Sequence, residues 1–262
     1  MKRFTLLLLG LIVAFSACDK DDDNDNNSSN NGNIDVKEEQ EAYVLLTTAT
    51  WCGYCGDWGI PTFDGAFAGD DGVDPDKING LALHYSDSDP MYHAMAAEMK
   101  TEFGIGGPPN LWIEFDNSYN LQPSNWVTAV KDRQNESNPT CGVGLNVDQN
   151  GNDFTVDVKV EFFENISGTY NLAIYVAEDG IVESQSGSTS DHSHKEVLRG
   201  EITNGTAWGV EMFSGDESGD YTESFNFTAD GELVADNLKF VAVVYEMESG
   251  SPVASPNSNT AE

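Results

Sequence analysis

Two patterns of apolar and polar positions follow one another along the chain beyond residue 40. In the first, short apolar runs alternate with segments whose apolar residues recur every three or four positions. Short apolar runs predict buried strands, and the three-to-four-residue period predicts helices that bury one face. The expected strands are 43–48, 78–85 and 111–115, and the expected helices are 57–67, 90–103 and 124–134, with Ser124 as an N-cap. This alternation predicts an α/β domain over residues 41–137.

Past residue 138 the apolar positions alternate with polar ones, and Asn-Gly, Asp-Gly and Gly-Asp turns separate the segments. The expected strands are 143–147, 154–162, 170–177, 196–202, 221–227 and 238–246. Such a series of short antiparallel strands predicts an all-β immunoglobulin-like sandwich over residues 138–262. The last ten or so residues are expected to be frayed.

The N-terminus has the three parts of a secretory signal. Lys2 and Arg3 precede an apolar stretch over residues 4–15, and small residues follow it. The apolar stretch is too short to span a bilayer as a mature helix, so residues 1–17 are predicted to be a cleaved signal peptide. The run 15–18 (Phe-Ser-Ala-Cys) resembles the lipobox of bacterial lipoproteins. That resemblance implies that Cys18 is lipidated and becomes the first residue of the mature protein.

An acidic segment follows Cys18 and contains almost nothing apolar up to about residue 33, so residues 18–40 are predicted to be a disordered tether. The whole chain has 12 Lys and Arg against 45 Asp and Glu, a net charge of −33. Such a surface repels nucleic acid and anionic lipid headgroups, so membrane contact is expected only through the lipid anchor. The acidic run has two interpretations. It is a plain linker, or it is the surface-sorting signal of some Gram-negative lineages, which it resembles. The predicted location is the outer membrane, facing the periplasm or the cell surface.

Cys52 and Cys55 form a CxxC motif between a predicted strand and a predicted helix. An exported compartment favours disulfides, and no second cysteine or histidine pair lies at zinc-finger spacing. Unpaired N–H groups and the dipole at a helix N-terminus stabilise a thiolate. Cys52 is therefore expected to be the attacking thiolate that forms a mixed disulfide with a substrate, and Cys55 is expected to resolve that mixed disulfide. No phosphate loop or other cofactor motif is present, so no cofactor is expected.

This context resembles thioredoxin-like proteins, which place a cis-proline beside the cysteine pair and just before a strand. The run 106–110 (Gly-Gly-Pro-Pro-Asn) fits that position, and the resemblance implies that Pro109 is the cis-proline that shapes the substrate groove. Two residues depart from the pattern. Leu46 stands where thioredoxins bury an acid beneath the pair, and Pro108 has no N–H to donate to a substrate strand.

A narrower resemblance covers nearly the whole mature chain. The CxxC strand, the run 83–87 (Leu-His-Tyr-Ser-Asp) and the run 191–199 (Asp-His-Ser-His-Lys-Glu-Val-Leu-Arg) together resemble the outer membrane protein twenty-eight related family. That resemblance implies a lipoprotein with a thioredoxin-like domain followed by a β-sandwich. It leaves the activity undefined.

His192 and His194 lie two apart, so on a strand they face one way. We predict no metal site and explain this pair by hydrogen bonding within or between domains. The alternative is a shared metal, which His84 or His93 could complete only if the two domains touch. Cys141 has no obvious partner, and we expect it to be a buried free thiol.

Two functional hypotheses follow. The first is a membrane-tethered thiol–disulfide oxidoreductase that acts on thiols or disulfides of exported proteins. The second is a non-enzymatic outer-membrane or surface binding lipoprotein whose Cys52–Cys55 disulfide braces the junction of strand and helix. The intact CxxC motif favours the first, whereas Leu46 and Pro108 favour the second. The sequence leaves the substrate, the direction of electron flow and the oligomeric state open.

Overall fold

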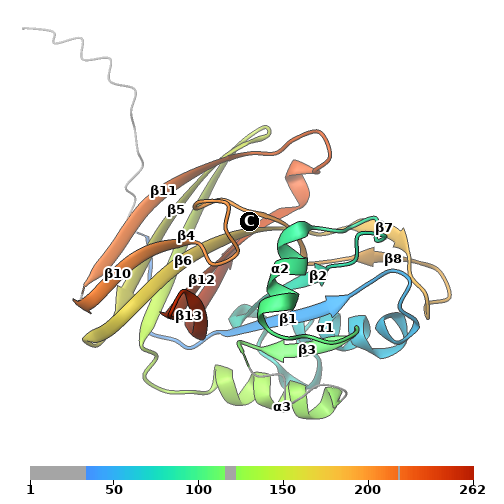
Figure 1. The fold of residues 1–262 in the computed structure, drawn as a ribbon, viewed down its shortest axis with the longest axis horizontal. Helices are drawn as coiled ribbons and strands as arrows, with labels where there is room; N and C mark the ends of the chain where they lie inside the picture. The colour runs from blue at the N-terminus through green and yellow to red at the C-terminus, as the bar shows by residue number, and fades with distance from the viewer. Residues whose placement is uncertain (1–33, 116–121, 218) are drawn as a thin grey trace, which may run out of the picture. The chain divides into compact units, whose positions relative to one another are not determined.

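The computed structural model describes residues 34–115, 122–217 and 219–262, and these belong to one compact unit (Figure 1). The predicted signal peptide, Cys18 and most of the predicted tether lie outside the described residues. The described chain is rich in β-sheet, with thirteen strands and three α-helices.

The elements follow one another in a mixed α/β part and then an almost all-β part. The helices are α1 (Ile60–Phe67), which continues from a π-helical turn (Cys55–Gly59), α2 (Ala94–Glu102) and α3 (Pro123–Gln134). The strands are β1 (Ala42–Thr48), β2 (Ile78–His84), β3 (Asn110–Ile113), β4 (Cys141–Asn150), β5 (Asp153–Phe162), β6 (Ile166–Glu178), β7 (Ile181–Ser184), β8 (Asp191–His194), β9 (Val197–Glu201), β10 (Val210–Glu217), β11 (Asp220–Thr228), β12 (Leu238–Glu248) and β13 (Ser251–Ala261).

One large sheet runs through both parts of the chain. Its eight strands include the path β13-β12-β6-β9-β2-β1-β3, and β10 also pairs with β6. β1 is parallel to β2 and antiparallel to β3. The two parts join where Ala82 of β2 pairs with Val197 of β9. The predicted boundary between residues 137 and 138 therefore falls between segments that share one sheet, and their division into two domains stays a prediction.

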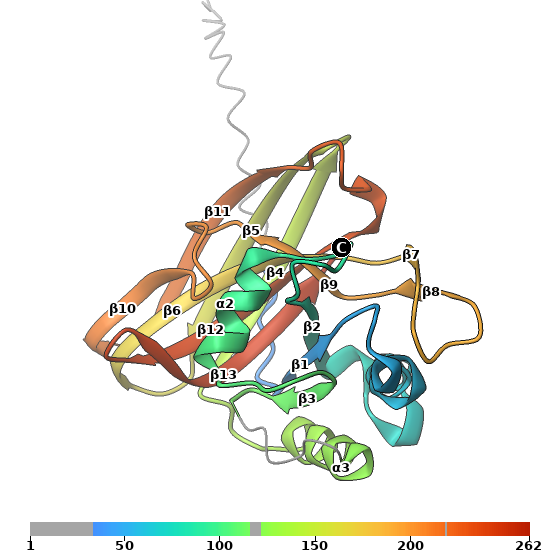
Figure 2. The same cartoon turned by 45° about the vertical axis from the view of Figure 1, so that its right-hand side comes forward.

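Both faces of the large sheet are covered. Val44 and Leu46 of β1 pack with residues of α1 and α3, and Tyr43 and Leu45 pack on the opposite face with α2. Further along, alternate residues of β6 and β12 face the three-stranded sheet β11-β5-β4. Figure 2 shows this small sheet and the helices α1 and α3 toward opposite ends of the molecule. The predicted β-sandwich is confirmed, but one of its two sheets also contains β1, β2 and β3 of the mixed α/β part.

The element boundaries differ from the prediction where local capping decides them. α2 begins at Ala94, several residues later than expected, because the His93 ring accepts a hydrogen bond from Met95 N at its first turn. α3 begins at Pro123 with Gln122 as N-cap, so the N-cap role predicted for Ser124 was wrong. Proline fits the first helical position because its missing N–H would have no partner there.

The C-terminal segment is a strand and not the frayed end that the polar sequence predicted. β13 pairs with β12 along its length. Its polar side chains find partners on the neighbouring strand β4, since Asn257 Nδ2 donates to Cys141 O and Asn259 Nδ2 donates to Val143 O, each at 2.7 Å. Residues 34–37, placed in the tether by the sequence, also lie against β4, where a Cβ at Gly142 would meet Lys37 O at 2.6 Å.

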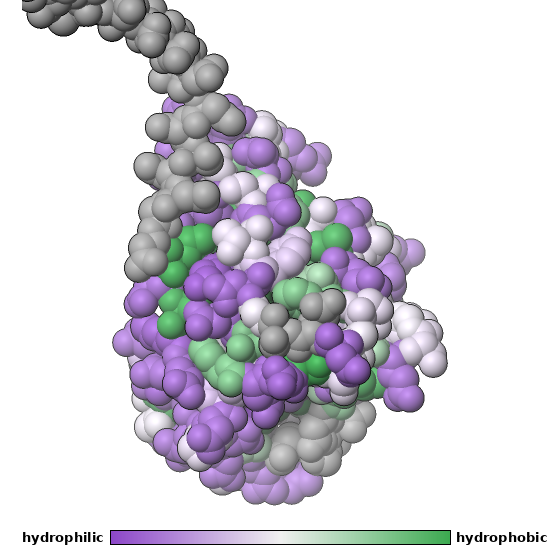
Figure 3. Space-filling model, turned by 90° about the vertical axis from the view of Figure 1, so that its left-hand side faces the viewer, coloured by the Kyte–Doolittle hydropathy of each residue, from purple (hydrophilic) through white to green (hydrophobic). Residues whose placement is uncertain are grey.

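The visible surface is largely hydrophilic. Figure 3 shows one face of the molecule, on which hydrophilic side chains predominate and hydrophobic ones form separated areas. No helix of the described residues is long and apolar enough to cross a membrane.

Glu41, just before β1, predicts a pH-dependent stability. Its Oε2 accepts a hydrogen bond from Asn79 Nδ2 at 2.6 Å, and burial raises its pKa from 4.5 to about 7. Because the folded chain then holds this proton more tightly than the unfolded chain, stability falls as the pH rises from 4.5 to about 7. Glu41→Gln keeps an acceptor and removes the titration. We expect it to stabilise the chain by about 3 kcal/mol at pH 8 and by less than about 1 kcal/mol at pH 5.

Urea unfolding of both chains at the two pH values checks this prediction. Glu39→Gln, a change at a more exposed carboxylate of the same segment, controls for the lost charge. An equal gain from Glu41→Gln at pH 5 and pH 8 would contradict it.

Candidate functional site

The CxxC motif lies where β1 gives way to α1. Cys52 N donates to Ala49 O at 3.0 Å, which turns the chain from the strand into the helical segment. Cys52 and Cys55 form a disulfide with their Cα atoms 5.2 Å apart, and Cys55 N donates to Cys52 Sγ at 3.1 Å. Cys55 is fully buried and Cys52 is 6% exposed. The sulfur nearer the surface therefore receives a backbone N–H, which is a contact that stabilises a thiolate.

Pro109 lies against the helix that follows the two cysteines. The peptide bond between Pro108 and Pro109 is cis, and a Cβ at Gly59 would meet Pro109 Cβ at 2.6 Å. Only glycine fits at position 59 without moving this loop. Asn110 Nδ2 donates to Gly107 O and closes the turn. The structure thus pairs Cys52 with Cys55 and places Pro109 against Gly59, at the end of the helical turn that begins at Cys55. The catalytic roles of these three residues stay predictions.

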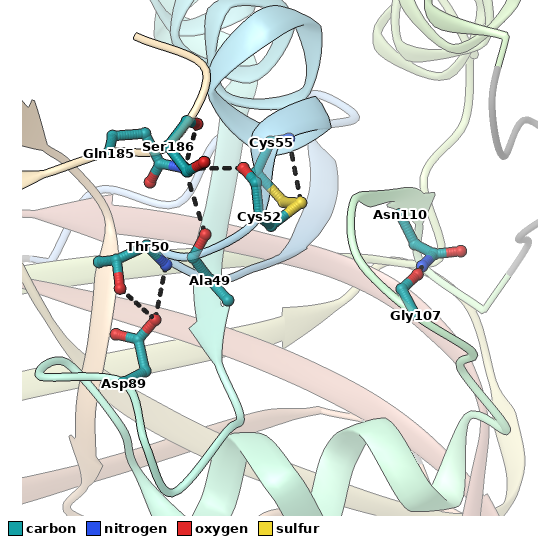
Figure 4. The surroundings of a disulfide bond; sticks show 9 residues. All are labelled: Ala49, Thr50, Cys52, Cys55, Asp89, Gly107, Asn110, Gln185 and Ser186. Carbon is teal, nitrogen blue, oxygen red and sulfur yellow. Dashed lines mark hydrogen bonds between the residues drawn. A yellow bond between two sulfur atoms is a disulfide. The ribbon is translucent and has the colours of Figure 1, made fainter.

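The β7–β8 hairpin also contacts the disulfide loop, and the sequence did not predict it. Gln185 Nε2 donates to Cys52 O at 3.0 Å and to Ala49 O at 3.2 Å, and Ser186 N donates to Thr50 O at 2.8 Å. Figure 4 shows Gln185 and Ser186 on one side of the cysteine pair and the Gly107–Asn110 turn on the other. In the sequence, the one sign of a loop at this place is the polar run around Gly187. The hairpin holds the carbonyls before and within the motif in place.

The buried position beneath the pair is apolar, as the sequence indicated. Leu46 belongs to the same buried cluster as Cys52 and Cys55. Asp89 is the acid that contacts this loop, because its Oδ2 accepts from Thr50 N at 2.7 Å. Burial alone would raise the pKa of Asp89, but hydrogen bonds from His84, Thr50 and Met91 lower it to about 2. Asp89 is therefore ionised and anchors the loop without being available to accept a proton near neutral pH.

The structure places His192 and His194 beside His84, so the contact between the two parts of the chain exists. The Nε2 atoms of all three are buried and have no hydrogen-bond partner among the described residues. His192 Nε2 does lie 3.3 Å from Asp64 Oδ2 of α1, and the hydrogen bonding predicted for His192 and His194 stays a prediction. His93 lies apart as the N-cap of α2. Among the described residues Cys141 is a buried free thiol, as expected, and burial raises its pKa to about 12.

A family model described as outer membrane protein Omp28 matches residues 96–255, more than half of the chain. The chain belongs to the outer membrane protein Omp28 family. Membership in the Omp28 family confirms the predicted resemblance and the predicted location at the outer membrane. The matched range begins after Cys52 and Cys55, so it carries no information about the disulfide.

Among solved structures, the chain is similar to the crystal structure of a domain of the outer membrane lipoprotein Omp28 from Porphyromonas gingivalis. The sequence identity is 18% and the TM-score 0.31, and the match covers 45% of this chain and 96% of that one. No curated protein matches the chain.

Proposed function

We propose that this Omp28-family protein is a thiol–disulfide oxidoreductase that acts on exported proteins, with residues 41–137 as a thioredoxin-like unit and lipidated Cys18 as its anchor. The observation that carries the proposal is the Cys52–Cys55 disulfide at the start of a helix, with Cys55 N–H on Cys52 Sγ and Pro109 packed against the same helix. The parallel pair β1–β2 and the antiparallel pair β1–β3 support a thioredoxin-like arrangement of strands.

The reaction balances within the pair and its substrate. In the reduced protein the Cys52 thiolate attacks one sulfur of a substrate disulfide, and the other substrate sulfur leaves as a thiolate. Cys55, once deprotonated, attacks Cys52 Sγ, releases the substrate as a dithiol and re-forms the Cys52–Cys55 disulfide. Two electrons pass from the protein to the substrate. The reverse sequence oxidises a substrate dithiol, and the reduction potential of the pair sets the direction.

The attack of Cys55 on the mixed disulfide is expected to be the slow step. Cys55 is fully buried, and Leu46 supplies no carboxylate to take its proton. A buried thiol surrounded by apolar groups loses its proton reluctantly because the thiolate is poorly solvated there. Mixed disulfides on Cys52 should therefore persist long enough to be trapped.

A second candidate function is binding without catalysis. The near-complete burial of Cys52 and the hairpin hydrogen bonds on its carbonyl favour a disulfide that braces the loop. In this case the pair would have a reduction potential below about −300 mV, the range typical of structural disulfides.

Turnover and potential together distinguish the two candidates. For the oxidoreductase we expect the pair to equilibrate with a glutathione buffer and the mature chain to accelerate insulin reduction or the refolding of scrambled ribonuclease. Cys52→Ser should lower the rate to background, and Cys141→Ser, which alters a buried free thiol outside the site, should leave it unchanged. Equal and negligible rates for wild type and Cys52→Ser would leave the binding function.

A further inference from the structure

Three of the chain's four histidines meet next to the disulfide loop. His84 ends β2, and His192 and His194 lie on β8, more than a hundred residues later. The ring centres of His84 and His194 are 5.4 Å apart, and those of His192 and His194 are 4.8 Å apart. Two imidazoles bound to one tetrahedral zinc ion, with Zn–N bonds of about 2.0–2.1 Å, have ring centres about 5 Å apart. The spacing of the rings thus fits a shared ion.

The second observation is a set of buried nitrogens without partners. His84 and His194 are 1% and 2% exposed, and within the part of the chain that the structure describes the Nε2 atom of each has no hydrogen-bond partner. A buried polar atom without a hydrogen bond destabilises the fold, and a bound ligand would relieve that cost.

Asp89 orients the first of these rings. Its Oδ1 lies 3.0 Å from His84 Nδ1, and a carboxylate oxygen there accepts the Nδ1 proton. The lone pair of His84 is therefore on Nε2, the buried nitrogen without a partner. A carboxylate on the far nitrogen of an imidazole is the arrangement that fixes the tautomer and orientation of zinc-bound histidines.

Asp64 of α1 supplies a fourth donor. Its Oδ2 lies 3.3 Å from His192 Nε2, within ion-pair distance. Two donor atoms on one tetrahedral zinc ion lie about 3.3 Å apart. As the rings stand, no three His, Cys, Asp or Glu side chains of the described residues converge on one point. The His84–His194 and His192–His194 spacings fit a shared ion, so binding needs the side chains of His192 and His194 to turn until their nitrogens converge with His84 Nε2.

We propose that His84, His192 and His194 bind one zinc ion through their Nε2 atoms, with Asp64 as the fourth ligand and Asp89 as the orienting carboxylate. Neutral imidazole nitrogens and one carboxylate are ligands that zinc prefers. The ion would link β2, β8 and α1. Asp89, which also holds Thr50, connects this site to the disulfide loop.

Calorimetry with Zn²⁺ and the visible absorption of bound Co²⁺ test the proposal on the mature chain with Cys52–Cys55 oxidised. The readout is metal binding, so it does not depend on thiol activity. We expect one ion per chain, a Co²⁺ spectrum of a four-coordinate site, and affinity at least about tenfold weaker in His192→Gln and His194→Ala. His93→Asn, at the remaining histidine, keeps a capping side chain and should bind as wild type does.

Melting curves without metal establish whether each variant is folded, and His192→Gln, at a half-buried position, decides the test if His194→Ala unfolds. No binding to the wild-type chain overturns the proposal. So does binding that survives in the variants of His192 and His194, or binding that His93→Asn weakens equally.

Discussion

Gly187→Ala is expected to push the β7–β8 hairpin off the disulfide loop. Gly187 has φ +88°, and an added Cβ would overlap Gly53 O and lie 2.9 Å from Gly53 C and 3.1 Å from Asp57 N. The strained backbone and the loss of the hairpin's hydrogen bonds should together cost at least about 2 kcal/mol of stability. Because Cys52 would become more exposed, dithiothreitol should reduce the disulfide several times faster. Urea unfolding and thiol-release kinetics measure the two effects.

Gly250→Ala is a matched control. Gly250, between β12 and β13, also has φ +88°, but no atom lies within 4 Å of the added Cβ. It should therefore show only the backbone cost of about 1–2 kcal/mol, with an unchanged rate of disulfide reduction. If both variants reacted with dithiothreitol at the wild-type rate, the hairpin would not protect the disulfide.

Tyr245→Ala is expected to destabilise the whole described chain in one step. The hydroxyl of Tyr245 donates to that of Tyr43 at 3.2 Å and lies 2.8 Å from that of Tyr175, and all three tyrosines are buried. Tyr43 is on β1, whereas Tyr175 and Tyr245 are on β6 and β12. The hydrogen bonds among the three hydroxyls therefore connect the two predicted domains. Removing a buried aromatic ring costs about 3–5 kcal/mol, and two hydroxyls would also lose a partner.

The shape of the unfolding transition is the more informative readout. Because β2–β9 pairing and the three tyrosines join the two predicted domains, we expect them to unfold together. Far-ultraviolet circular dichroism and tryptophan fluorescence should therefore both report a single transition, at a lower urea concentration than in the wild type. Tyr92→Ala, at a tyrosine that is 40% exposed, should change stability little. Two separate transitions would instead show that residues 41–137 and 138–262 fold independently.

Most strands and helices could be predicted because each is recognisable from its own residues. The apolar runs of β1 and β12 and the alternation of β5 reflect which faces each strand buries, and that is a local property. β13 could not be predicted, because its Asn257 and Asn259 are stabilised by carbonyls of β4, more than a hundred residues away. Polar strands of this kind carry no periodic apolar signal.

The candidate site divides in the same way. The sequence by itself determined that Cys52 and Cys55 lie at the start of a helix and that Leu46 leaves the position below them apolar, because these relations span a few residues of one strand and one helix. Only the tertiary structure decided that Gln185 would hold the Cys52 carbonyl and that His84 would meet His192 and His194. These contacts join residues more than a hundred positions apart, and the sheet register that brings them together depends on packing along the whole chain.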